Sequence, residues 1–407
     1  MKADPDGAGF DERRLERITE HFKTRYVESG KIPGCQVAVA RGGKVAYWRS
    51  LGLMDRERSK PVADDTIWRI YSMTKPVTSL ALMQLYEQGL FQLTDPLHRY
   101  IPEWRHLRVG ELQADGSLRM VDQARPVSVR DALTHMTGLA GGVTPDHPTD
   151  DRFADALREA RHGMTLEGVC SLLADFPLKF QPGSRWNYGL STDVCARLVE
   201  ILSGERFDRY LQTHVFAPLG MVDTGFSVAD DSVSRFAACY NYRPGGSPAL
   251  QDDPEQSPFR RLRSYQSGAG GPGLVSTSGD YLRFCQMLLN GGELAGRRLI
   301  GRKTLDLMTA NHLPGHAELS DLATGGFGEV EFDGVGFGLG FAIGNGPAAT
   351  GTAGSVGEYF WGGAASTAFW VDPVEDLTVV FMTQLLPSSS YPFRAQLRAL
   401  VYQALAD

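Results

Sequence analysis

Short β-rich runs stand near both ends of the chain, and this feature most restricts the possible folds. The stretch CQVAVARGGKVAYWRSLG, residues 35–52, holds two such runs around Gly42-Gly43, the pattern of a hairpin, and a surface helix is expected before it over 11–27. Three further runs lie at 334–344, 366–373 and 377–384, and an amphipathic helix is expected over 391–407. Since an isolated hairpin is marginal in water, we expect an α+β fold in which both chain ends build one antiparallel sheet flanked by helices.

The middle of the chain has a different character. The stretches 165–176 and 190–204 have helical spacing and are separated by turns that contain Pro and Gly. The segment 241–273 is rich in Gly, Pro and Ser, so we interpret it as a surface loop. This pattern predicts a mainly helical second lobe.

We place the domain boundaries by this change of pattern. Residues 1–70 and 265–407 form the expected sheet region, and residues 71–264 form the expected helical region. A crevice between two lobes is the default place for a ligand, so we expect the active site there.

Composition excludes several classes of function. Lys and Arg total 41 against 48 Asp and Glu, a net charge of -7 without a basic cluster, so we expect no nucleic-acid partner. The polar N-terminus and the absence of a long apolar run predict a soluble, cytoplasmic protein without membrane contact, although a removed signal peptide would leave no trace. The cysteines number 5 and lack metal-binding spacing, which predicts reduced core residues and no metal site.

One helix start carries a candidate nucleophile. Ser72 follows a short extended segment and precedes a buried helix whose first turn accommodates Pro76. Lys75 stands three residues after Ser72, a spacing that puts both side chains on one helical face. A serine hydroxyl needs an adjacent base, and a lysine can serve when burial and nearby dipoles keep it neutral. The alternative is that Ser72 caps the helix while Lys75 points to solvent.

Two more motifs follow the Ser72 and Lys75 pair along the chain. Tyr188 follows a Pro-Gly turn and precedes an amphipathic helix, and Trp361-Gly362-Gly363 begins a strand. Together with Ser72 and Lys75 they resemble the serine β-lactamase and penicillin-binding-protein superfamily, and more closely the family VIII carboxylesterases, which look like class C β-lactamases. The segments 131–139 and 268–284 extend the resemblance over nearly the whole chain, which implies a β-lactamase-like fold.

The resemblance implies a role for each matching residue. Ser72 corresponds to the acylated nucleophile, Lys75 to the lysine beside it, and Tyr188 to the tyrosine that shares proton transfer. The backbone N–H groups of Ser72 and Ala364 correspond to the oxyanion hole. No cofactor is implied. The alternative for Tyr188 is a core position at a helix start, and we expect His135 to orient a loop rather than to catalyse.

The substrate-binding positions depart from the β-lactamase pattern. Trp361 replaces the lysine that attracts a carboxylate, and Leu190 replaces the asparagine of the Tyr-x-Asn motif, while Gly362 and Gly363 still allow close backbone approach. The other reading of the two glycines is a plain strand edge beside a packed tryptophan. A pocket lined by Leu190 and Trp361, and also by Tyr240 or Phe360, should prefer a neutral, apolar group.

These departures favour hydrolysis of a small-molecule ester. Several alternatives stay open: acyl transfer to an alcohol, β-lactamase or D-alanyl-D-alanine peptidase activity, and a non-catalytic homologue that only binds ligands. The sequence leaves the oligomeric state open, and it does not decide whether Lys75 or Tyr188 is the general base.

Overall fold

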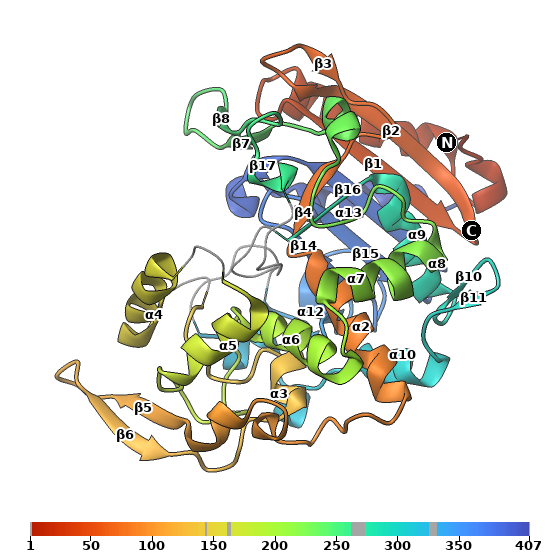
Figure 1. The fold of residues 1–407 in the computed structure, drawn as a ribbon. Coiled ribbons are helices and arrows are strands. Elements are labelled where there is room, and N and C mark those ends of the chain that lie inside the picture. Colours follow the sequence, from red (N-terminus) through yellow and green to blue (C-terminus); the bar gives the residue numbers. More distant parts are fainter. Residues whose placement is uncertain (1, 143–144, 161–163, 262–272, 325–331, 407) are drawn as a thin grey trace.

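An eight-stranded sheet lies at the centre of one side of the molecule (Figure 1). The structure, a computed structural model, describes residues 2–142, 145–160, 164–261, 273–324 and 332–406. Every neighbouring pair in the sheet is antiparallel. The strands, in spatial order, are β12 (Val335–Phe337), β13 (Ala342–Gly344), β14 (Tyr359–Gly362), β15 (Ala368–Asp372), β16 (Leu377–Thr383), β1 (Gly34–Arg41), β2 (Lys44–Asp55) and β3 (Lys60–Pro61).

The two ends of the chain meet where β1 pairs with β16. The pairing runs in register from Cys35 opposite Thr383 to Arg41 opposite Leu377. β1 and β2 are joined at Gly42-Gly43, where φ is 59° and 73°, a backbone that glycine adopts without a steric penalty. The structure therefore confirms both the predicted hairpin and the predicted sheet built from the two chain ends.

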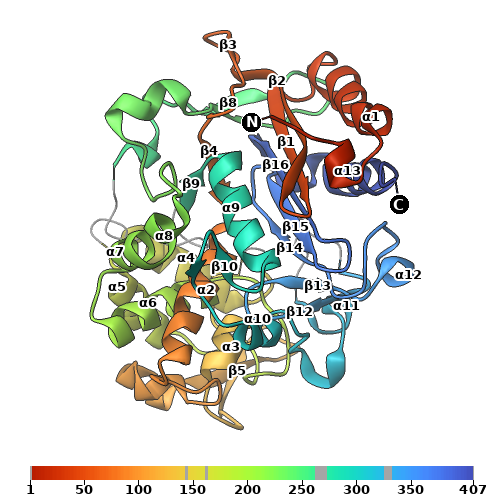
Figure 2. The ribbon, with the colours of Figure 1, turned by 90° about the vertical axis from the view of Figure 1, so that its right-hand side faces the viewer.

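Helices cover both faces of this sheet. The terminal helices α1 (Glu12–Phe22) and α13 (Phe393–Tyr402) lie side by side on one face, and α9 (Ser278–Leu289) lies on the other (Figure 2). Successive residues of β16 follow this division, since Phe381 packs with α1 and α13 while Met382 packs in the core that contains α9. This alternation is what a sheet buried on both sides requires.

Most of the remaining helices gather beside the sheet in a second group (Figure 1). Its centre is α2 (Thr74–Glu87), which packs against α6 (Ser191–Ser203) and is buried along most of its length. The fold is thus α+β with a mainly helical second part, as predicted, whereas the division at residues 70 and 265 stays a prediction. The other helices are α3 (Val129–Leu133), α4 (Pro148–Glu159), α5 (Leu166–Ala174), α7 (Phe207–Leu211), α8 (Ala217–Leu219) and α10 (Arg302–Met308), together with α11 (Leu319–Leu322) and α12 (Pro347–Thr350), which lie by the β12–β13 end of the sheet (Figure 2).

The prediction of a continuous loop over 241–273 is wrong in part. β8 (Ala249–Asp252) pairs with β7 (Cys239–Asn241), and Gly245, with φ of 70°, lies in the turn between them. The Gly- and Pro-rich stretch therefore contains a hairpin turn, while residues 262–272 lie outside the described part of the chain. The strands of the smaller sheets are β7 (Cys239–Asn241) and β8 (Ala249–Asp252) with β17 (Leu385–Leu386), β4 (Trp68–Tyr71) with β9 (Leu274–Ser276), β5 (Arg108–Leu112) with β6 (Leu118–Asp122), and β10 (Glu293–Leu294) with β11 (Arg297–Arg298).

The state of the cysteines and the lengths of the helices relate to the predictions of reduced core thiols and of no membrane contact. All five cysteines are buried as free thiols, as predicted, and burial raises the pKa of Cys35, Cys170 and Cys195. Such thiols pack as small apolar groups. Within the described ranges, none of the helices has the length and apolar character needed to cross a bilayer.

Candidate active site

Ser72 lies in the turn that joins β4 to α2. β4 ends at Tyr71, whose φ of 43° is uncommon for a residue with a side chain and turns the chain sharply. The Ser72 carbonyl accepts the N–H of Lys75 at 3.0 Å, so the first turn closes directly behind the serine. Ser72 is 6% exposed. The local backbone therefore presents a nearly buried hydroxyl at the start of a helix.

Neighbouring elements hold this turn in place. The Tyr281 hydroxyl of α9 donates to the Met73 carbonyl at 2.9 Å. The Thr74 hydroxyl accepts the N–H of Leu274 in β9, also at 2.9 Å. Because both partners are buried parts of other elements, the position of the serine is set before any ligand arrives.

Lys75 contacts the serine directly. Its Nζ donates to Ser72 Oγ at 3.2 Å, and the side chain is buried with the residue only 2% exposed. The alternative in which Lys75 points to solvent is therefore wrong, as is a capping role for Ser72, because α2 begins at Thr74 without a side-chain cap. A hydroxyl and an amine at this distance meet the geometric condition for a nucleophile and its base.

Tyr188 completes the group from a different part of the chain. Its ring centroid lies 4.6 Å from Lys75 Nζ, and its hydroxyl accepts a hydrogen bond from Trp361 Nε1 at 3.2 Å. The preceding residue is fixed in turn, since Asn187 N–H donates to the His135 carbonyl at 2.9 Å. The structure thus brings Ser72, Lys75, Tyr188 and Trp361 together.

His135 lies behind the tyrosine. Its ring centroid is 4.8 Å from that of Tyr188, and its carbonyl accepts the Asn187 N–H. Complete burial, reinforced by the charge of Lys75, holds the pKa of His135 well below its ordinary value, so its imidazole is neutral. These contacts agree with the expectation that His135 orients a loop.

The prediction that Trp361-Gly362-Gly363 begins a strand is wrong, because Trp361 and Gly362 end β14 and Gly363 follows in the turn toward β15. Trp361 pairs with Phe369 of β15 and is 1% exposed. A Cβ placed on Gly363 would stand 2.5 Å from the Ile70 carbonyl oxygen, so only glycine allows this strand to approach the backbone that leads into Ser72. The oxyanion role of the next residue, Ala364, and that of Ser72 stay predictions.

The predicted pocket-lining residues fare differently. Leu190 is 3% exposed and lies against Gly141, so it offers little surface to a ligand. The prediction that Phe360 lines this site is wrong. Phe360 and Trp361 are adjacent in β14 and point to opposite faces of the sheet, and the Phe360 ring lies against Arg398. The prediction for Tyr240 is also wrong, because its hydroxyl donates to Glu57 and its ring packs in the core that contains α1 and α13.

Sequence reasoning missed a buried ionic cluster beside Tyr188. Lys179 Nζ donates to Asp150 Oδ2 at 2.9 Å and to Asn187 Oδ1 at 3.0 Å, and it also pairs with Asp146. Asp150 Oδ1 in turn accepts the N–H of Gly141 at 2.9 Å. The cluster ties three separate segments around the tyrosine, and their irregular spacing in the sequence gives no motif from which it could be found.

The combined geometry suits acyl transfer. A hydroxyl nucleophile lies 3.2 Å from an amine, and the ring of a phenol, a group type that can relay a proton, lies against the same amine. Among the residues that the structure describes, no group of three His, Cys, Asp or Glu side chains is arranged to hold a metal ion.

Comparison with known sequences agrees with this geometry. The beta-lactamase family profile matches residues 17–403. Esterase EstB of Burkholderia gladioli is 30% identical over 423 residues, covering 98% of each chain. Protein Rv1367c of Mycobacterium tuberculosis is 31% identical over 366 residues, which cover 89% of this chain and 88% of that protein.

Solved structures show the same fold. EstCE1, described as a hydrolase with promiscuous acyltransferase activity, superimposes with a TM-score of 0.78 at 27% identity, covering 96% of this chain and 99% of that one. Simvastatin synthase (LovD) of Aspergillus terreus gives a TM-score of 0.76 at 23% identity, covering 95% and 96%. The chain therefore belongs to the beta-lactamase family, as a serine hydrolase of the type that includes the family VIII carboxylesterases.

Proposed function

We propose that this protein hydrolyses short-chain carboxylic esters through an acyl-enzyme on Ser72. The observation that carries the proposal is the 3.2 Å hydrogen bond from Lys75 Nζ to Ser72 Oγ inside a buried site, with the Tyr188 ring 4.6 Å from the same Nζ. A polar group is buried at a cost unless it is paired. Ser72 and Lys75 at the start of α2 and Tyr188 just before α6 place three polar groups in one buried site, an arrangement that a catalytic role explains.

In the first half of the reaction, Ser72 Oγ attacks the ester carbonyl carbon. Its proton passes to the unit formed by Lys75 and Tyr188, and the carbonyl oxygen becomes an oxyanion. The N–H groups of Ser72 and Ala364 stabilise that oxyanion. When the intermediate collapses, the bond to the leaving alcohol breaks and the alcohol takes the proton from the same unit, which leaves the acyl group on Ser72.

Water completes the cycle by the same steps in reverse. The Lys75 and Tyr188 unit takes a proton from water as its oxygen attacks the acyl carbon, and Ser72 Oγ leaves with that proton. Trp361 Nε1 donates to the Tyr188 oxygen at 3.2 Å, a bond that strengthens when this oxygen carries negative charge. The indole therefore supports the tyrosine whenever it acts as a base.

The substrate class follows from the neutral side chains at two positions. Trp361 carries no charge to hold a substrate carboxylate, and Leu190 carries no amide to hold a side-chain carbonyl. A neutral ester needs neither contact. Short acyl chains are favoured because the serine is nearly buried, at 6% exposure, and the bulky Trp361 packs against Tyr188 in the same site.

The test compares p-nitrophenyl acetate, butyrate and octanoate by kcat/KM. Turnover of acetate and butyrate, with octanoate slower, is expected, and Ser72→Ala should abolish it. Ser79→Ala is the matched control, since it removes another buried serine hydroxyl, seven residues after Ser72 and within α2. An active Ser72→Ala variant, or a wild-type chain that releases at most one equivalent of p-nitrophenol, would refute the proposal.

A second candidate is acyl transfer from Ser72 to an alcohol. The observation in its favour is the similarity to EstCE1, whose description includes promiscuous acyltransferase activity. The two functions are separated by incubating the protein with vinyl butyrate at increasing concentrations of 1-butanol and measuring the butyl ester and the free acid that form. Hydrolysis predicts acid as the main product, whereas an ester-to-acid ratio that rises steeply at millimolar alcohol would identify a transferase.

A further inference from the structure

The turn between β14 and β15 carries Ala364, the proposed second donor of the oxyanion hole. The turn closes where Gly363 N–H donates to the Thr367 carbonyl at 2.9 Å and Ser366 N–H donates to the Gly363 carbonyl at 2.9 Å. Ser366 has φ of 69° and its hydroxyl donates to the Leu385 carbonyl at 2.7 Å. The direction of the Ala364 N–H therefore depends on how firmly this short turn is held.

Arg394 holds the same turn from the outer face of the sheet. It belongs to the first turn of α13, and its Nη2 donates to the Thr367 carbonyl at 3.0 Å, the carbonyl that also accepts from Gly363. A Cβ on Gly362 would stand 2.4 Å from Arg394 Nη2, so the guanidinium rests directly on the glycine. A cation thus packs against Gly362, and the next residue, Gly363, lies against the Ile70 carbonyl, two residues before Ser72.

We propose that Arg394 is a positioning residue for the oxyanion hole, acting through the Thr367 carbonyl. A charge-assisted hydrogen bond is stronger and more directional than a neutral one. Here it fixes the plane of the peptide that closes the turn, and with it the direction of the Ala364 N–H. An oxyanion donor contributes most when it is already oriented as the charge develops. The proposal rests on the ester hydrolysis proposed above.

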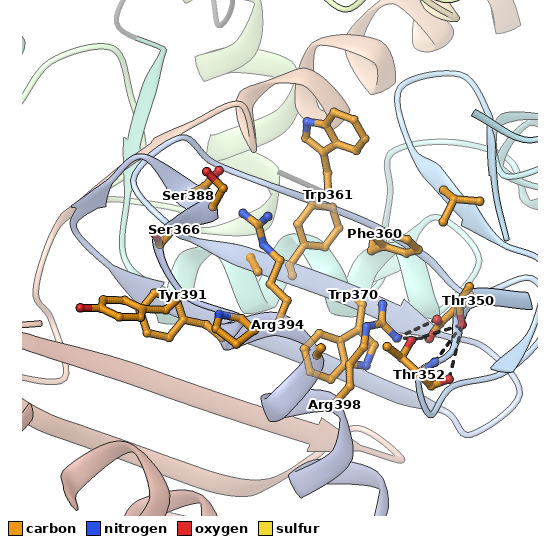
Figure 3. Close-up of a pocket in the computed structure, with 18 of the residues that line it drawn as sticks. Thr350, Thr352, Phe360, Trp361, Ser366, Trp370, Ser388, Tyr391, Arg394 and Arg398 are labelled. Carbon is orange, nitrogen blue, oxygen red and sulfur yellow. Dashed lines mark hydrogen bonds and ion pairs between the residues drawn. The ribbon is translucent and has the colours of Figure 1, made fainter. Parts of the chain in front are cut away.

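A cavity beside the guanidinium makes the proposal testable. It has a volume of about 360 Å³ and lies between α13 and the outer face of β14 and β15, with Ser388, Tyr391 and Trp370 among its lining residues. Arg394 and Arg398 extend from α13 into this cavity (Figure 3). Truncation of Arg394 would join its own volume to the cavity, so a free guanidinium ion has room to take the place of the side chain.

The second arginine provides a matched control. Arg398 lies one turn further along α13, lines the same cavity, and pairs with Glu358 through two hydrogen bonds of 2.7 and 2.6 Å. Arg398→Met therefore removes an equivalent cation without removing a contact to the turn. It should lower the stability of the protein while leaving kcat within about threefold of wild type, as expected for a site that keeps its catalytic contacts.

The experiment measures p-nitrophenyl butyrate hydrolysis and inhibition by butylboronic acid, which adds to a serine hydroxyl and mimics the tetrahedral intermediate. Arg394→Ala should lower kcat roughly 10- to 100-fold with little change in KM, less than the ~100- to 1,000-fold typical for loss of an oxyanion donor. Boronic acid affinity should fall in parallel. Guanidinium chloride at millimolar concentration should restore activity to Arg394→Ala and not to Arg398→Met.

Three results would overturn the inference: an unchanged kcat in Arg394→Ala, a lower kcat with unchanged boronic acid affinity, or no response to guanidinium. If Arg394→Ala does not fold, Arg394→Lys replaces it, and parallel losses in kcat and boronic acid affinity support the inference while a loss in kcat alone refutes it. Absence of ester hydrolysis in the wild-type chain would refute the proposed function instead, so the two failures are distinguishable.

Discussion

Replacement of Trp361 by phenylalanine tests how Tyr188 handles protons. The substitution keeps an aromatic ring against Tyr188 and removes the Nε1–H group that donates to the tyrosine oxygen at 3.2 Å. The bond is buried, because Trp361 is 1% exposed and Tyr188 is 4% exposed. Water therefore cannot readily replace the lost donor, and the effect should be visible in the kinetics.

The magnitude follows from the two charge states of the acceptor. A hydrogen bond to a neutral phenol contributes about 1 kcal/mol, and one to a charged group contributes about 1.5–3 kcal/mol. Loss of the bond therefore disfavours the ionised tyrosine by roughly 0.5–2 kcal/mol relative to the neutral one. At about 1.4 kcal/mol per pH unit, the acid limb of kcat/KM should move to higher pH by about 0.4–1.5 units.

The assay is the pH profile of kcat/KM for p-nitrophenyl butyrate, with Trp370→Phe as the control. Trp370 lies on β15, is 2% exposed and faces the opposite side of the sheet, in the core formed with α1 and α13. Its replacement removes the same atoms without touching Tyr188, so its acid limb should coincide with that of wild type. An unshifted limb in Trp361→Phe, or an equal shift in both variants, would refute the reasoning.

Three further predictions concern the same site. Lys75 and Tyr188 form one proton-handling unit, so Lys75→Ala with Tyr188→Phe should be little worse than either single variant, and additive losses in kcat would show separate roles. Trp361 offers no charge and Leu190 no amide to a β-lactam, so about 2.5–4 kcal/mol of hydrogen bonding is missing. The kcat/KM of nitrocefin should therefore be roughly two to three orders of magnitude below that of p-nitrophenyl butyrate. Comparable kcat/KM values would contradict this. The depressed pKa of His135 means that the unfolded chain binds a proton below about pH 6.5 that the folded chain excludes. The stability that neutral His135 contributes is therefore complete above that pH and is lost as the pH falls. The free energy of unfolding by urea should then depend less on pH between about 5.5 and 7.5 in His135→Asn than in wild type. Equal pH dependence in the two proteins would refute the neutral imidazole.

Much of the fold was predictable because strand and turn patterns are local. The hairpin at Gly42-Gly43 requires glycine backbone conformations, and the strands of 366–384 are apolar enough to be recognised at once. The β7–β8 hairpin was not, because its turn at Gly245 lies in a segment whose Gly and Pro content favours a loop. The composition of the whole segment favours a loop, whereas one turn at a single glycine is enough to pair β7 with β8.

The site residues divide in the same way. Ser72 and Lys75 share one helix start, so their contact follows from local spacing. The contact between Trp361 and Tyr188 joins residues far apart in the chain, and only the resemblance to a family predicted that they would meet. Phe360 was assigned to the wrong face because adjacent strand residues point to opposite sides of the sheet, a rule that needs a known register before it can be applied.

The contacts of Arg394 and Lys179 lay beyond sequence reasoning for a related reason. Arg394 acts on a turn carried by a different element, and Lys179 gathers acidic and amide partners from three separate segments. Neither contact has a fixed spacing in the chain. Tertiary packing alone creates them, so no motif could have revealed them.

The central claim is that Ser72 becomes acylated, and mass spectrometry after treatment with a fluorophosphonate tests it most directly. One adduct per chain is predicted, located by peptide mapping on Ser72, absent from Ser72→Ala and retained in Ser79→Ala. Slower labelling is predicted for Lys75→Ala, because the hydroxyl then lacks its proton acceptor. An adduct on any other residue, or full labelling of Ser72→Ala, would contradict the account.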